Sequence, residues 1–198
     1  MMNRLVVERC DIVPREEARR LFDLPQDGPV LLVAGGSLGA RALNDLAIES
    51  FGPAGPAVLH LSGEREHERL RGRVSRAEYR LLPFTDDYGA ALGASDLALS
   101  RAGGGVWELA AAGKPAILVP YPLATADHQT KNAGYFQTAG GAILVREGDL
   151  GRVPEIVRSL LGDDRRLEEM GAAMRRAARP GAAEEIAEEL MSLAATRG

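Results

Sequence analysis

The sequence predicts an α/β protein in which a parallel sheet carries helices on both faces. Apolar runs of about four or five residues, which are typical of buried strands, recur along the chain. Segments with helical spacing of apolar side chains separate these runs, and this alternation predicts repeated strand–helix–strand units. Many of the 23 glycines stand where an apolar run ends rather than in linkers. Because ligands of parallel sheets bind at the carboxyl ends of the strands, these turns are the candidate sites.

The elements follow in order from local signals. An ambiguous edge strand is expected within 4–8, and Pro14, a favourable first helical residue, predicts a helix over 14–22. The further expected strands are 30–34, 57–61, 79–83, 96–100, 116–120 and 142–145. The further expected helices are 40–50, 64–71, 86–93, 106–112, 128–138 and three in the remainder of the chain. Gly113 is expected to end one helix and Asp127 to cap another, with breaks between the last three at Gly162 and 180–181.

Composition excludes several classes of protein. The 198 residues suffice for about one domain. The net charge of −4 and the aromatic content of 5% argue against nucleic acid as a partner. No uncharged run reaches the roughly 18 residues of a membrane span and no secretory signal opens the chain, so a cytoplasmic setting is expected. The single cysteine, Cys10, permits neither an internal disulfide nor a cysteine-based zinc site, and no metal site is expected.

The first candidate turn is Gly35–Gly39, between an expected strand and an expected helix. Free amides at a helix start favour an anion, glycines let the backbone approach a ligand, and Ser37 adds a hydroxyl donor. The glycine spacing is not that of a dinucleotide fingerprint, and no Walker-type lysine follows. A tight turn without a ligand explains the motif equally well.

The second candidate turn runs from Ser100 through Gly103, Gly104 and Gly105 to Glu108. Three glycines before a helix are entropically unfavourable, which indicates a close approach of the backbone to a ligand. Glu108 fits two roles equally: stabilising the helix dipole, or accepting hydrogen bonds from vicinal hydroxyls such as those of a ribose. Trp107 is expected to be a packing residue.

The third candidate turn is the polar run 127–132, where Gln129 and Asn132 offer donors and acceptors for sugar hydroxyls. His128 has no neighbours that would make it a metal ligand, and His60 and His67 are expected to have no functional role. Together the three turns predict a phosphate-bearing, hydroxyl-rich ligand such as a nucleotide sugar.

Five segments resemble, in the same order, motifs of the C-terminal half of the MurG family of peptidoglycan glycosyltransferases. They are Val33–Asn44, Phe84–Asp87, Ser100–Gly103, Glu108–Pro115 and Asp127–Ala133. The resemblance implies one half of a GT-B fold, which consists of two Rossmann-like domains with a cleft between them. It implies that residues 14–198 form the domain that binds the donor, UDP-GlcNAc, and that 1–13 are a linker or the remnant of an edge strand.

By the same resemblance, the diphosphate would face Gly36, Ser37 and Gly39, and the uracil would lie by Thr85. The three glycines Gly103, Gly104 and Gly105 would pass along the nucleotide, and Glu108 would accept the ribose hydroxyls. His128 and Gln129 would meet the N-acetylglucosamine hydroxyls, with Asn132 in support. Two departures stand out: the 101–108 segment is about one residue shorter than in many relatives, and Gly105 replaces a common serine or threonine. Arg15 is not matched to the family's nucleotide-contacting arginine.

The family transfers N-acetylglucosamine to lipid-linked muramyl pentapeptide with inversion at the anomeric carbon. The resemblance implies no cofactor. Its acceptor-binding half, with the catalytic base, is not among these residues, so the chain alone is expected to be inactive. The implied partners are UDP-GlcNAc, that other half in cis or in trans, and through it the lipid-linked acceptor at the inner face of the cell membrane. Three alternatives stay open: a subunit of a split glycosyltransferase, half of a UDP-GlcNAc 2-epimerase-like enzyme, and a non-catalytic nucleotide-binding module.

Overall fold

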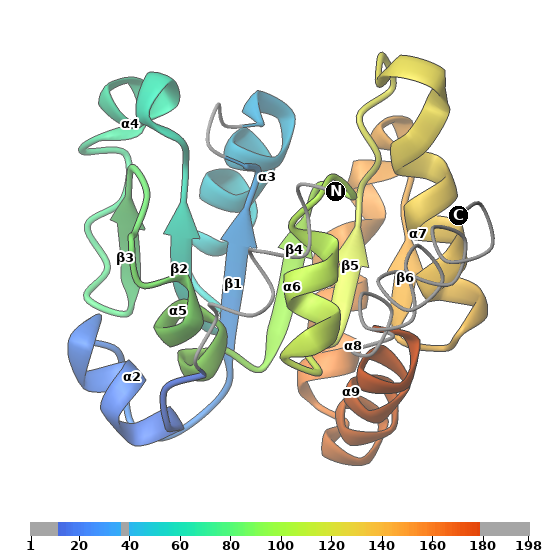
Figure 1. Cartoon of the computed structure of the whole chain (residues 1–198). Coiled ribbons are helices and arrows are strands. Elements are labelled where there is room, and N and C mark those ends of the chain that lie inside the picture. The colour runs from blue at the N-terminus through green and yellow to red at the C-terminus, as the bar shows by residue number, and fades with distance from the viewer. Residues whose placement is uncertain (1–11, 37–39, 179–198) are drawn as a thin grey trace, which may run out of the picture.

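A computed structural model describes residues 12–36 and 40–178, and it confirms the α/β class with one parallel sheet between two layers of helices (Figure 1). The strands are β1 (Val30–Ala34), β2 (Ala57–Leu61), β3 (Tyr79–Leu82), β4 (Leu97–Ser100), β5 (Ala116–Leu118) and β6 (Ala142–Leu144). The helices are α2 (Arg15–Leu21), α3 (Arg41–Phe51), α4 (Glu64–Leu70), α5 (Tyr88–Ala94), α6 (Val106–Ala111), α7 (His128–Thr138), α8 (Val153–Leu161) and α9 (Asp164–Ala177). Two 3-10 turns, η1 (Thr125–Asp127) and η2 (Glu147–Arg152), precede α7 and α8.

The strand order β3-β2-β1-β4-β5-β6 places the first strand at the centre of the sheet. Ala34 at the end of β1 pairs in register with Leu61 on one side and with Ser100 on the other. The chain therefore builds outward to β3, crosses back to β4 and continues in the opposite direction. The carboxyl ends of β1 and β4 form the topological switch point, where sheets of this kind bind ligands.

Successive side chains of each central strand pack into two separate hydrophobic cores, one on each face, because side chains alternate across a sheet. Leu32 and its equivalents pack against α2, α5, α6, α7 and α9, whereas Leu31 and its equivalents pack against α3, α4 and α8. Both leucines are fully buried. Burial on both faces explains why the strand segments of the sequence are continuous apolar runs rather than alternating ones.

The expected elements of the described residues are present, with small differences at their ends. Asp127 precedes α7 as expected, but its cap role was predicted wrongly: the residue has a left-handed φ of 54° and its side chain makes no capping hydrogen bond. The expected strand in 4–8, Cys10 and the last expected helix lie outside the described residues. The division between 13 and 14 stays a prediction. Within the described ranges, every helix is too short or too polar to cross a membrane.

Arg19 ties the opposite, amino edge of the sheet together. Its side chain is fully buried, and Nε donates to the carbonyl of Ala94 at 3.1 Å while Nη2 donates to Asp96 Oδ2 at 2.9 Å. Its Nη1 donates to three carbonyls of the loop before β1, those of Pro25, Gln26 and Gly28. Arg15 also pairs with Asp96, so Arg15 lies at the amino edge as well, far from the switch point.

Candidate functional site

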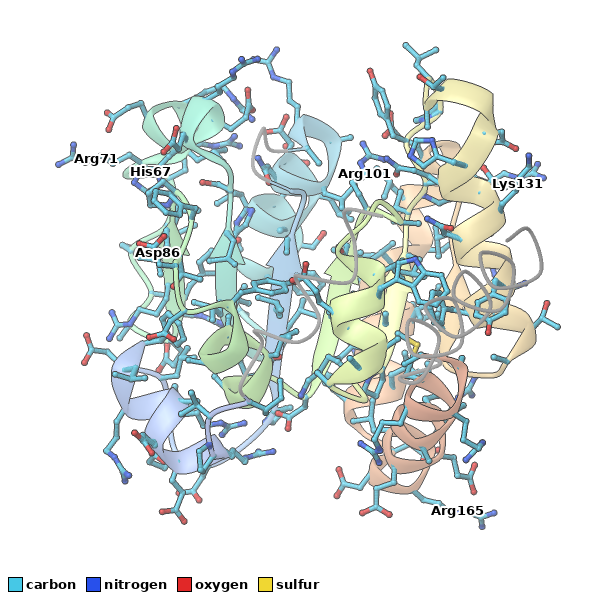
Figure 2. All side chains as sticks on the ribbon, in the orientation of Figure 1. His67, Arg71, Asp86, Arg101, Lys131 and Arg165 are labelled. Carbon is cyan, nitrogen blue, oxygen red and sulfur yellow. The ribbon has the colours of Figure 1, made fainter. Side chains whose placement is uncertain are left out.

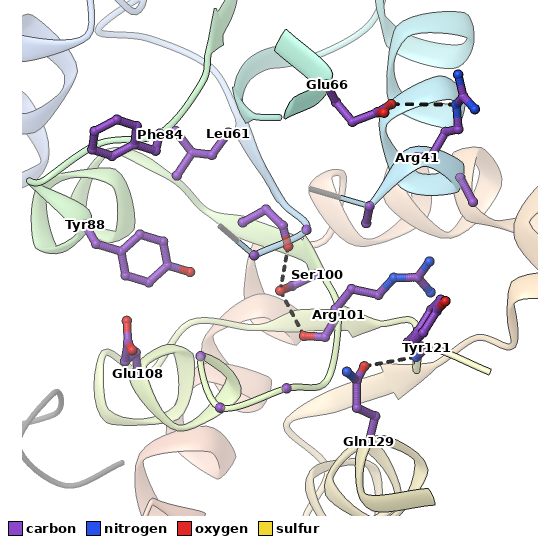
Figure 3. A pocket seen from close by; sticks show the side chains of 18 of the residues that line it. Arg41, Leu61, Glu66, Phe84, Tyr88, Ser100, Arg101, Glu108, Tyr121 and Gln129 are labelled. Atoms are coloured by element: carbon purple, nitrogen blue, oxygen red, sulfur yellow. Dashed lines mark hydrogen bonds and ion pairs between the residues drawn. The ribbon is translucent and has the colours of Figure 1, made fainter. Parts of the chain in front are cut away.

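A cleft of about 1220 Å³ opens at the carboxyl edge of the sheet, over the switch point. The turns after β1, β3, β4 and β5 line it together with the starts of α3, α6 and α7 (Figure 3). Seven of the predicted site residues line this cleft: Gly36, Thr85, Gly103, Gly104, Gly105, Glu108 and Gln129. Ser37 and Gly39 lie outside the described residues, and His128 and Asn132 are not among the lining residues.

The turn after β1 requires both of its described glycines. Gly36 has φ +89°, a left-handed conformation that is strained for other residues. A Cβ on Gly35 would lie 2.5 Å from the Cβ of Ala40, so only glycine lets the chain return this closely. Ala40 and Arg41 at the start of α3 line the same cleft, which brings the positive end of that helix to it.

The glycines after β4 leave space rather than supply an unusual conformation. Gly105 has φ −62°, and a Cβ there would meet no atom within 4 Å. A Cβ on Gly103 would meet only Nε2 of Gln129, at 3.8 Å. Side chains at these positions would therefore occupy the cleft, and their absence leaves the backbone open to it.

Glu108 projects from the first turn of α6 into the cleft, on the same side as Tyr88 (Figure 3). Its carboxylate is partly buried, and burial raises its pKa. Within residues 12–36 and 40–178 this carboxylate has neither a hydrogen-bond donor nor an ion-pair partner. A desolvated acceptor facing a cleft is suited to a ligand that brings two hydroxyl donors.

The turn after β3 presents an apolar ring beside a fixed hydroxyl. Phe84 is 48% exposed although it lines the cleft. The Oγ1 atom of Thr85 accepts a hydrogen bond from the backbone N–H of Asp87 at 3.1 Å, which stabilises the turn. A flat ring with polar edges is the kind of ligand group that fits beside Phe84.

The polar run at the start of α7 divides into three different roles. Gln129 lines the cleft, and its Oε1 accepts from the backbone N–H of Tyr121 at 2.9 Å. Asn132 donates from Nδ2 to the carbonyl of Ala102 at 3.0 Å, so it anchors the glycine turn from behind. His128 is exposed and donates from Nδ1 to the carbonyl of Thr125 at 2.8 Å.

Several charged residues of the cleft were not predicted as site residues. Asp45 and Glu66 line it, and Arg69 donates to both carboxylates, at 2.7 and 2.9 Å. Arg101 and Glu147 line it as an ion pair. These pairs neutralise most of the acidic groups, which suits an anionic ligand. Among the described residues, no three His, Cys, Asp or Glu side chains gather in a way that could hold a metal ion.

The sequence matches the family model "Glycosyltransferase family 28 C-terminal domain" over residues 30–186. It is 43% identical over 175 residues to the UDP-N-acetylglucosamine–N-acetylmuramyl-(pentapeptide) pyrophosphoryl-undecaprenol N-acetylglucosamine transferase of Nitratidesulfovibrio vulgaris strain DP4, covering 84% of this chain and 48% of the relative. The enzyme of that name from Chlorobaculum parvum is 40% identical over 186 residues, covering 91% of this chain and 51% of that enzyme. The chain thus spans about half the length of the curated relatives it matches.

Solved structures agree with the fold. Acinetobacter baumannii MurG has a TM-score of 0.76 and 28% identity, covering 92% of this chain and 54% of that one. The glycosyltransferase VinC, crystallised with dTDP, has a TM-score of 0.65 at 21% identity, covering 95% and 46%, and this likeness concerns the fold alone.

Proposed function

The chain belongs to the family of glycosyltransferase family 28 C-terminal domains, and from this premise we propose that it holds UDP-GlcNAc as the donor-binding half of a MurG-like glycosyltransferase. The observation that carries the proposal is the convergence of three strand-to-helix turns on one cleft at the topological switch point. The cleft offers the groups that such a ligand needs: for phosphate a helix start, for a diol a carboxylate that no described residue pairs, and for sugar hydroxyls an amide.

The residues of the three turns and of the turn after β3 then have separate roles. The diphosphate lies against the turn at Gly36 and the start of α3, and the uracil lies by Phe84 and Thr85. The three glycines after β4 let the backbone pass along the nucleotide, and Glu108 accepts hydrogen bonds from both ribose hydroxyls. Gln129 contacts the N-acetylglucosamine, while Asn132 supports the glycine turn. The roles of Ser37, Gly39 and His128 stay predictions from the resemblance.

In the proposed reaction an acceptor oxygen attacks the anomeric carbon from the face opposite to UDP. The new C–O bond forms as the bond to the β-phosphate oxygen breaks, and that oxygen leaves with the electron pair. The proton of the acceptor hydroxyl goes to a base on the acceptor-binding half, which we propose as the partner in cis or in trans, at the cytoplasmic face of the membrane. This chain supplies the cradle that stabilises the departing UDP.

Calorimetric titration tests the proposal directly. UDP and UDP-GlcNAc are expected to bind this chain, ADP is expected to bind more weakly, and no turnover is expected. Glu108→Ala should remove most of the UDP affinity, because it removes both acceptors for the ribose. An absence of heat at millimolar UDP would contradict the proposal, and a preference for ADP would favour a different nucleotide-binding function. Formation of UDP-ManNAc from UDP-GlcNAc would instead indicate an epimerase.

A further inference from the structure

Arg101, the first residue after β4, lies at the carboxyl edge of the sheet between α3 and α7, whereas Arg165 lies at the opposite end (Figure 2). Its side chain is only 10% exposed. Nη1 donates to the carbonyls of Val119 and Pro120, both at 3.2 Å, and Nη2 pairs with the Glu147 carboxylate. One guanidinium thus joins the ends of β4 and β5 to η2.

These contacts fix Arg101 within the fold. Its guanidinium donates to two carbonyls and pairs with the Glu147 carboxylate, so three acceptors hold its position. What Arg101 does hold in place is the backbone at Pro120 and Tyr121. The Tyr121 ring also stacks on it, with the guanidinium carbon 5.4 Å from the ring centroid.

The same segment of backbone orients Gln129 (Figure 3). The N–H of Tyr121 needs an acceptor, so the atom of the Gln129 amide that lies 2.9 Å from it must be the oxygen. The amide nitrogen then points the other way, toward the space in front of Gly103, where a Cβ would lie 3.8 Å from it. Gln129 therefore presents N–H donors to the cleft, while its oxygen faces the N–H of Tyr121.

We infer that Arg101 is a positioning residue that, through the backbone of Tyr121, holds the Gln129 amide with its N–H groups toward the ligand. The sugar end of the ligand is consequently recognised at an oxygen that accepts a hydrogen bond. This inference rests on the proposed function, since it assumes a nucleotide sugar in the cleft. It assigns no contact with the nucleotide to Arg101, so the nucleotide and the sugar should respond differently to its replacement.

The experiment compares the dissociation constants of UDP and UDP-GlcNAc by calorimetry. Arg101→Lys keeps the charge but cannot reach two carbonyls and a carboxylate at once. It is expected to leave the dissociation constant of UDP within about twofold and to lose the extra affinity of UDP-GlcNAc, a factor of about three to ten for one or two hydrogen bonds. Gln129→Glu removes the donors at constant shape and should lose the same factor. Glu147→Gln still accepts a hydrogen bond from Arg101, so it should lose a smaller part of the extra affinity of UDP-GlcNAc. This variant replaces Arg101→Lys in the experiment if Arg101→Lys does not fold.

Arg76→Lys is the matched control. Arg76 also donates to two backbone carbonyls, those of Gly55 and Pro56, but it does not line the cleft, so the ratio of the two constants should be unchanged. If Arg101→Lys weakened the binding of UDP and of UDP-GlcNAc equally, Arg101 would have only a structural role and the inference would be overturned. A wild-type chain that binds UDP and UDP-GlcNAc equally would also overturn it, with nucleotide binding intact. A wild-type chain that binds neither would overturn the proposed function itself, and the inference with it.

Discussion

The imidazole Nε2 of His60 lies 2.9 Å from Oδ1 of Asn44, inside the core between α3 and β2. The Asn44 amide nitrogen donates to the carbonyl of Ser62 at 2.9 Å, so its oxygen is the acceptor and His60 must carry its proton on Nε2. Nδ1 then accepts from the hydroxyl of Tyr79 at 2.8 Å. This buried chain fixes the helix that starts at the cleft against the sheet.

The chain should make the stability depend on pH through His60. Burial lowers the pKa of His60 from 6.5 to about 3, so the unfolded state binds the proton more tightly than the folded state. Stability is therefore complete above pH 6.5 and falls as the pH decreases toward 3. The contribution lost between pH 7.5 and pH 4 is about 3 kcal/mol.

Urea unfolding of the wild type and His60→Gln at several pH values measures this contribution. The difference in unfolding free energy between the two proteins should shrink as the pH falls from 7 to 4. A difference that stays constant over this interval would show that folding leaves the pKa of His60 unchanged.

Glu108→Gln should change stability and binding in opposite directions. Burial raises the pKa of Glu108, so the folded state binds the proton more tightly and loses stability as the pH rises above the ordinary carboxyl range. The glutamine variant is neutral and should have a higher melting temperature than the wild type at pH 8. Its UDP affinity should nevertheless be lower, because one ribose acceptor is replaced by a donor. A parallel loss of both would show that the carboxylate has a structural role.

Gly36→Ala and Gly105→Ala form a second informative pair. The φ of +89° at Gly36 predicts a loss of about 1–2 kcal/mol in unfolding free energy on adding a Cβ. The φ of −62° and the open space at Gly105 predict a change within about 0.5 kcal/mol. Because that space is the cleft, Gly105→Ala should still weaken UDP binding. Thermal denaturation and calorimetry on the same samples separate the two effects, and normal UDP binding by Gly105→Ala would place the nucleotide elsewhere.

Arg19→Met should be the most destabilising of these changes. It leaves the buried carbonyl of Ala94 and the carbonyls of Pro25 and Gln26 without this donor and removes one partner of Asp96, for a loss of about 3–5 kcal/mol. Arg20→Met, on the same helix, removes a guanidinium that is 65% exposed and 4.0 Å from Glu16, and it should change stability by less than about 0.5 kcal/mol. Similar unfolding midpoints for the two variants in urea would contradict the role given to Arg19.

The sequence predicts the sheet well because its strands are buried on both faces. Val30–Ala34 is a continuous apolar run, Ala57–Leu61 is interrupted only by His60, and the structure has strands with these same bounds. Strand ends that depend on longer-range pairing were predicted less accurately. The expected strand 116–120 stops at Leu118, two residues before Pro120, which has no N–H to pair. The polar run 127–132 predicts a helix start, yet composition does not reveal that Asp127 adopts a left-handed conformation.

The candidate site was predicted only where one turn carries the signal. Glycines after strands and Glu108 are visible within a few residues of sequence, and the cleft contains them. Arg101 gives no such signal, because its partners Val119 and Glu147 are 18 and 46 residues away. An arginine after a strand is also common at protein surfaces, so only the fold distinguishes it from a solvated side chain.

Arg19 is anchored at the amino edge of the sheet, and the cleft lies at the carboxyl edge. The residues of the Arg19 network are therefore separate from the residues that line the cleft. Substitutions in the turns after β3 and β4 can therefore accumulate without weakening the Arg19 network. Such a scaffold can be adapted to other ligands by changing a few turn residues, and an engineer can randomise those turns while leaving the amino rim untouched.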